Sequence, residues 1–185
     1  MFCRWHVTLL FTVVTFSVLT GAQDQKTSLA NPSPEMGRLA KMFVGDWDTE
    51  ENMERGDYFP NGGGRHGITH WKLAAGDKAL IGEGHSNGSA GELSYLIAIW
   101  WDKPASVYRF FTCFNESETP CVVRGTAHWE GDTFINEYEE SVKGEKKKFR
   151  DIFTQAGPNS RSLVAAIETS DGKWRPLITT KSTRR

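Results

Sequence analysis

The sequence between residues 46 and 184 divides into ten short β-type runs separated by Gly, Asn and Asp, and this pattern limits the fold more than any other feature. The runs cover 46–54, 65–74, 78–86, 93–102, 107–115, 121–130, 133–142, 145–155, 162–170 and 173–184. A meander of this length has two long sheet edges, and closure into a barrel removes both. We therefore expect an all-β fold, an antiparallel up-and-down barrel of about ten strands. A β-sandwich is the second choice, and an open sheet wrapped on a helix is the third.

Three tight turns set the expected strand registers. Gly131-Asp132, Lys143-Gly144 and Asp171-Gly172 each resemble the centre of a two-residue hairpin turn. These turns place opposite charges across from each other, Glu137 with Arg150, Glu139 with Lys148 and Glu168 with Arg175. The other faces of the same strands pair Phe134 with Phe153 and Tyr138 with Phe149. We expect these aromatic faces to line the interior.

The N-terminal residues have the parts of a secretory signal peptide. Arg4 precedes an apolar run from Val7 to Leu19, and the small residues Gly21 and Ala22 follow it. We expect cleavage after residue 22, a disordered polar leader over 23–34, and a single barrel domain over 35–185. A short helix is expected from Pro34 to Phe43. The apolar run is shorter than the roughly 20 residues of a membrane helix, so we expect no transmembrane segment and a periplasmic or secreted protein.

The cysteines agree with export. Cys3 lies in the expected signal peptide, which leaves Cys113 and Cys121. In an oxidising compartment this spacing favours a disulfide that closes a short loop, worth about 2.5 kcal/mol on the chain-entropy model. We expect no metal site, since two thiols alone do not supply the ligands. His66 and His70 share a strand face but lie roughly 13 Å apart along it.

The net charge and the absence of several motifs argue against some classes of function. The net charge of −1 leaves no broad basic face for nucleic acid. Gly62-Gly63-Gly64 lacks the Lys-Ser/Thr of a phosphate loop, and no Gly-x-Ser-x-Gly elbow holds a nucleophile. A haem interpretation is disfavoured because no histidine follows His128. We therefore expect no cofactor, and we place enzymes last among the function classes.

The segment Gly45-Asp46-Trp47 after a short helix resembles the opening of the calycin superfamily, which includes the lipocalins and fatty-acid-binding proteins. This resemblance implies that Trp47 on the first strand packs near Arg184 on the last, where the barrel closes. A longer series resembles the bacterial exported proteins of the domain-of-unknown-function 1579 family: Pro34-Glu35-Met36, Val44-Gly45-Asp46-Trp47, Pro60-Asn61-Gly62-Gly63-Gly64, Trp100-Trp101-Asp102, Gly125-Thr126-Ala127-His128-Trp129-Glu130-Gly131-Asp132 and Trp174-Arg175-Pro176-Leu177. The second resemblance implies a calycin-like barrel and no established activity.

An inward arginine is the main candidate for a site. If Cys113 and Cys121 are bonded and their hairpin has no bulge, Arg109 opposes Gly125, with Tyr138 on the other side of that glycine. A buried guanidinium must be paired. Its partner is either Asp151, in an internal network with Asn136 and Tyr138, or the acidic head of a ligand. The second arrangement resembles the Arg and Tyr anchor of fatty-acid-binding proteins. A slipped register would turn Arg109 outward.

These observations leave three hypotheses for the function. The first is a binding module whose interior takes a small hydrophobic or amphipathic molecule. Its apolar body would contact Phe111, Phe134, Phe149 and Phe153, and an acidic head would face Arg109 and Tyr138. The second is a filled barrel that acts as a structural or interaction protein through the outer surface around Trp100 or Trp101. The third is an enzyme that uses Tyr138, Asp151 or a histidine as acid or base.

Overall fold

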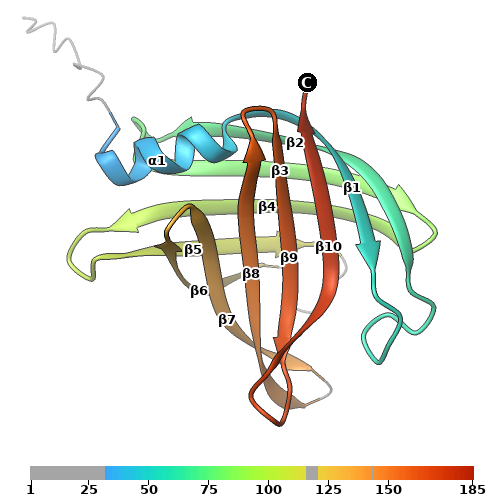
Figure 1. The fold of residues 1–185 in the computed structure, drawn as a ribbon. Coiled ribbons are helices and arrows are strands. Elements are labelled where there is room, and N and C mark those ends of the chain that lie inside the picture. The colour runs from blue at the N-terminus through green and yellow to red at the C-terminus, as the bar shows by residue number, and fades with distance from the viewer. Residues whose placement is uncertain (1–31, 116–120, 143) are drawn as a thin grey trace, which may run out of the picture.

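The structure, a computed structural model, describes residues 32–115, 121–142 and 144–185. Ten antiparallel strands follow one another around a closed barrel in chain order, and the last strand pairs with the first (Figure 1). This architecture confirms the expected up-and-down barrel. The expected signal peptide lies outside the described residues.

One helix precedes the strands. Helix α1 (Pro34–Phe43) is followed by β1 (Gly45–Met53), β2 (Gly63–Ala74), β3 (Ala79–Gly88), β4 (Gly91–Asp102), β5 (Val107–Phe114), β6 (Cys121–Glu130), β7 (Thr133–Val142), β8 (Glu145–Gly157), β9 (Ser160–Glu168) and β10 (Trp174–Arg184). Among the described residues, no helix combines the length and the apolar character that crossing a membrane requires.

Helix α1 closes one end of the barrel (Figure 1). It begins at Ser33, whose side-chain oxygen accepts a hydrogen bond from the amide of Met36 at 3.3 Å, and Pro34 occupies the first turn, where a missing N–H costs nothing. Leu39 and Phe43 are fully buried. The Phe43 ring contacts aromatic rings from β2, β7 and β8. The helix therefore forms a lid whose apolar face belongs to the barrel core.

Two glycines on β3 make room for large side chains inside the barrel. Gly82 pairs with Trp71 of β2, and the Trp71 ring lies over Gly82, so that a Cβ there would come within 2.6 Å of the ring. Gly84 pairs with Tyr95 of β4, whose ring lies over Gly84 in the same way. The β3 wall is thus lined by the rings of its neighbours rather than by its own side chains at these positions.

The expected hairpin registers are confirmed around β7. Glu137 opposes Arg150, Glu139 opposes Lys148, and the ring pairs Phe134 with Phe153 and Tyr138 with Phe149 are also present. The register expected after β9 is wrong, because Glu168 opposes Trp174 and not Arg175. The connection is longer than a two-residue turn, since the amide of Thr169 donates to the carbonyl of Lys173 at 2.8 Å. Glu168 instead forms an ion pair with Lys148 at 3.3 Å.

Candidate ligand site

The barrel interior holds a cavity of about 170 Å³. Its apolar lining residues include Ile97, Phe114, Phe153, Leu163 and Ile178. Most of its polar lining residues come from β9, β10, β1 and β2, and the part of the lining that they form is called the polar wall; Tyr138 and Asp151 lie outside it. The mixture of apolar and polar side chains gives the cavity the character of an amphipathic site.

The polar wall follows from strand pairing. Arg161 of β9 opposes Ser182 of β10, which opposes Thr49 of β1, so three side chains form one row across the inner face. Thr69 and Trp71 stand on the adjacent strand β2 and border the same cavity. The row therefore brings a guanidinium and hydroxyl groups to one side of the cavity.

Arg161 is the most unusual member of this wall, with only 5% of its surface exposed. Its Cζ lies 4.3 Å from the ring centroid of Trp47, 4.8 Å from that of Phe43 and 5.5 Å from that of Trp71. Its Nη1 donates to the carbonyl of Met42 at 3.5 Å. Within the described part of the chain, no carboxylate lies within ion-pair distance of it. Burial lowers the pKa of Arg161 to about 9, so the side chain remains a cation at neutral pH.

Further buried donors border the cavity without partners. The Oγ1 of Thr49 and the Nε1 of Trp71 have no hydrogen-bond partner among the described residues, whereas the Thr69 side chain interacts with the Tyr95 hydroxyl. Burial raises the pKa of the Tyr95 hydroxyl well above its usual value, which keeps this group protonated at neutral pH. Buried polar groups are normally satisfied, so a cluster of unsatisfied ones points to a missing partner.

A second arginine in the cavity is neutralised internally. The Nε of Arg65 contacts Oε2 of Glu51 at 2.8 Å, and both side chains are buried, at 2% and 8% exposure. The hydroxyl of Ser86 donates to Oε1 of Glu51 at 3.3 Å. The ion pair therefore differs from Arg161, which has no such counter-charge in the described residues.

The structure corrects the expected position of Arg109. Arg109 opposes Thr126 rather than Gly125, because the register shifts by one residue between Phe110 and Phe111. This shift is a β-bulge that leaves Arg124 as an extra residue on β6. The Arg109 side chain is 41% exposed, and its Nε contacts Oδ2 of Asp102 at 2.7 Å. Arg109 thus lies outside the cavity.

The bulge also changes the neighbours of Arg109 on β5. Phe110 takes the inward position opposite Gly125, and its ring lies 5.8 Å from that of Tyr138. Phe111 opposes Val123 and is half-buried, while Thr112 is buried on the inward side. Phe111 therefore does not border the cavity.

Of the other candidate residues, Tyr138, Asp151 and Phe153 border the cavity. The Tyr138 hydroxyl donates to Oδ1 of Asp151 at 3.4 Å. Asn136, Phe134 and Phe149 do not border it. Phe134 packs against helix α1 through Phe43, and Phe149 contacts Tyr58 of the loop after β1.

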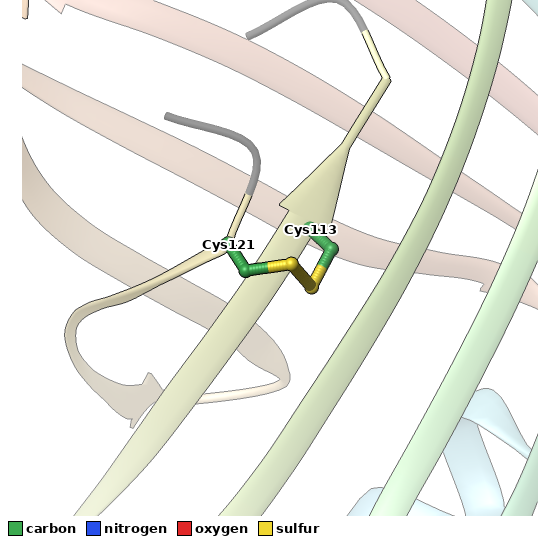
Figure 2. Close-up of a disulfide and its surroundings, with 2 residues drawn as sticks. All are labelled: Cys113 and Cys121. Atoms are coloured by element: carbon green, nitrogen blue, oxygen red, sulfur yellow. A yellow bond between two sulfur atoms is a disulfide. The ribbon is translucent and has the colours of Figure 1, made fainter. Parts of the chain in front are cut away.

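The remaining candidate residues lie at the barrel seam and on one hairpin. Trp47 opposes Arg184 across β1 and β10, and the Arg184 Cζ lies 4.4 Å from the Trp47 ring centroid. The predicted disulfide between Cys113 and Cys121 is present and joins β5 to β6, with the two Cα atoms 4.0 Å apart (Figure 2). No group of His, Cys, Asp and Glu that could hold a metal ion occurs among the described residues.

Sequence reasoning missed Arg161, although a signal was available. Arg161 shares the parity of Leu163, Ala165 and Ile167 on β9, and these apolar residues face inward. Alternate residues of a strand face the same side, so an arginine that alternates with inward-facing apolar residues is expected to be buried. The sequence-based start of this strand at residue 162 excluded it.

No family model matches the chain, and no curated protein does. Solved structures are similar in fold. Rv2717c from M. tuberculosis matches with a TM-score of 0.58 and 11% identity, over 84% of this chain and 99% of its own. The S-type phycobiliprotein lyase CPES from Guillardia theta matches with a TM-score of 0.52 and 12% identity, over 88% and 98%. At such identities the likeness shows the fold alone, a closed antiparallel β-barrel.

Proposed function

We propose that this protein is an exported binding module that holds one small molecule, apolar or amphipathic, in the interior of its barrel. The observation that carries the proposal is the cavity of about 170 Å³, whose lining combines apolar side chains with buried polar groups. Binding sites for small molecules combine a mostly apolar lining with a few placed polar groups, and barrels of this kind hold one ligand in the interior.

The size of the cavity restricts the ligand. An apolar cavity of about 150 Å³ accommodates benzene, whereas pockets for drug-sized molecules are about 300–1,000 Å³. The cavity here is about 170 Å³. A compact molecule with a single ring, or a short branched chain, therefore fits better than a long acyl chain.

Export is part of the same proposal. The disulfide between Cys113 and Cys121 is compatible with an oxidising compartment. A protein outside the cytoplasm with an interior site is suited to capture or carry a small metabolite.

Filling the cavity tests the proposal. Ala165 borders the cavity, so Ala165→Ile places added methyl groups inside it. The matched control is Ala98→Ile, since Ala98 stands between Ile97 and Ile99, which take the inward positions on β4. Toluene binding, measured by shifts of methyl NMR signals, is expected for the wild type and Ala98→Ile and is expected to be lost in Ala165→Ile. Absence of toluene binding to the wild type would overturn the proposal.

A second experiment identifies the natural occupant. The protein is purified from its own host, weighed by native mass spectrometry and extracted with organic solvent. A stoichiometric small molecule that Ala165→Ile fails to retain supports the proposal, and retention of that molecule by Ala165→Ile contradicts it.

A further inference from the structure

We propose that the cavity recognises its ligand through a carboxylate, which is bound by the guanidinium of Arg161 together with the buried donors of Thr49 and Trp71. This inference rests on the proposed function, since it names the chemical class of the molecule that occupies the interior. It assigns the head group to the polar wall at Arg161 and the apolar body to the apolar side chains of the lining.

The first argument is the charge balance of the interior. An unpaired charge in a protein interior costs several kcal/mol, so buried charges are paired or bound to a counter-ion. Arg161 is buried, and no described carboxylate pairs with it. Arg65 and Glu51 neutralise each other. The wall around Arg161 therefore carries an excess positive charge.

Asp151 does not supply the missing negative charge. It borders the same cavity, but it opposes Ala165, which stands four residues beyond Arg161 on β9. Four strand residues span roughly 13 Å. The Tyr138 hydroxyl donates to Asp151 at that distant end. The two charges thus occupy separate parts of the cavity.

The second argument concerns the edges of the guanidinium. The rings of Trp47 and Phe43 lie 4.3 and 4.8 Å from its Cζ, and aromatic rings interact with the face of a guanidinium. The N–H donors lie in the plane, along the edges. The carbonyl of Met42, at 3.5 Å, accepts from one of them. Donors therefore remain for a planar acceptor, and a carboxylate matches this fork geometry.

The third argument is the presence of neighbouring donors. Thr49 is separated from Arg161 by Ser182 in the same row, and its Oγ1 has no partner in the described residues. The Nε1 of Trp71 is equally unpartnered, and the Trp71 ring lies 5.5 Å from the Arg161 Cζ. An indole N–H can only donate. These groups can donate to a ligand head group that carries hydrogen-bond acceptors, such as a carboxylate.

The test compares three probes that share one ring and differ in the head group. Sodium benzoate carries the carboxylate, benzamide is a neutral analogue of nearly the same shape, and phenylphosphonate carries a larger anion. Binding is measured by isothermal titration calorimetry at neutral pH. Charge-assisted hydrogen bonds predict that benzoate binds about 10- to 100-fold more tightly than benzamide. Phenylphosphonate is expected to bind more weakly than benzoate.

Arg161→Gln removes the charge and is expected to abolish the preference for benzoate over benzamide. Arg109→Gln is the matched control, because Arg109 is an exposed arginine outside the cavity, and its variant should keep the preference. Thr49→Val removes one donor at nearly constant volume, and Trp71→Phe removes the indole N–H but also shortens the ring. Each is expected to weaken benzoate binding about 3- to 10-fold, and Thr49→Val is expected to leave toluene binding unchanged. For Trp71→Phe the ratio of benzoate to toluene affinity is compared with that of the wild type, since the ring change alters the space for both probes. These two variants test the inference even if Arg161→Gln does not fold.

The outcomes separate the inference from the proposed function. Equal affinity for benzoate and benzamide, with toluene still bound, overturns the carboxylate assignment and leaves the binding module intact. Tighter binding of phenylphosphonate than of benzoate also overturns it, because the head group would then be a phosphate-type anion. Failure of every probe, including toluene, overturns both.

Discussion

Replacement of Gly84 by alanine tests how closely Tyr95 packs against the β3 wall. A Cβ at position 84 would lie 2.3 Å from Cζ of Tyr95 and 2.6 Å from its hydroxyl oxygen, whereas ordinary contacts begin at 3.4 Å. The ring must therefore move by about 1 Å, and added methyl groups in a packed core typically cost about 1–3 kcal/mol. Because the ring borders the cavity and can move into it, we expect a loss of about 2 kcal/mol and a smaller cavity.

The assay is urea denaturation, with the free energy of unfolding extrapolated to water. Gly37→Ala is the matched control, since Gly37 lies in helix α1 and its added Cβ meets nothing within 4 Å. Helix propensity predicts that this variant gains about 0.5–1 kcal/mol. Replacement of glycine by alanine should thus lower the free energy of unfolding at position 84 and raise it at position 37.

A double variant attributes the effect to the ring. Tyr95→Ala removes the side chain that the new Cβ would meet, so Gly84→Ala should cost little in that background. Two results would refute the reasoning: wild-type stability for Gly84→Ala, or an equal cost with and without the Tyr95 ring.

Two further predictions concern the disulfide and the buried tyrosine. Replacing Cys113 and Cys121 by serine should lower the free energy of unfolding by about 2.5 kcal/mol, and an unchanged urea midpoint would contradict this. Burial raises the pKa of Tyr95 above its ordinary 10.0, so above pH 10 the unfolded chain loses this proton while the folded state keeps it. Stability should therefore fall with rising pH above 10, by up to about 1.4 kcal/mol per pH unit from this group. Tyr95→Phe should reduce that slope more than Tyr58→Phe, since burial raises the Tyr58 pKa but the charges of Lys147 and Arg175 counteract that rise. Equal slopes in the two variants would contradict the assignment.

Short turns explain how much of the fold could be predicted from the sequence. Gly131 and Gly144 each have positive φ, at 57° and 83°, in tight connections, so counting outward from them gives the registers of β6, β7 and β8 correctly. The ring pair of Tyr138 and Phe149 follows directly. The turn at Asp171 contains more residues, and the pairing of Glu168 could not be counted from it.

The candidate site was harder to predict, because one extra residue in a strand changes which side chains of the neighbouring strand face the interior. The bulge at Arg124 reverses the facing of Arg109, and no residue in that hairpin marks the bulge in the sequence. Strand ends are also poorly defined by composition, and Arg161 stands near the start of β9. The contacts of the Arg161 guanidinium with the rings of Trp47 and Phe43 join segments that are far apart along the chain. Such contacts appear only once the barrel is closed.

The pairing of β1 with β10 has a consequence for how the chain reaches this structure during synthesis. Trp47 meets Arg184 and Arg184 donates to the carbonyl of Val44, so the seam joins the first strand of the barrel to the last, across a separation of 140 residues for Val44 and Arg184. Contacts of such sequence separation form slowly, because the intervening chain must be ordered first. Until the final strand has emerged, β1 and β9 each present an unpaired edge that can add a strand from another chain. A ribosome that stalls before β10 would therefore release an aggregation-prone chain, and a chaperone that shields strand edges would act on this protein late in its synthesis.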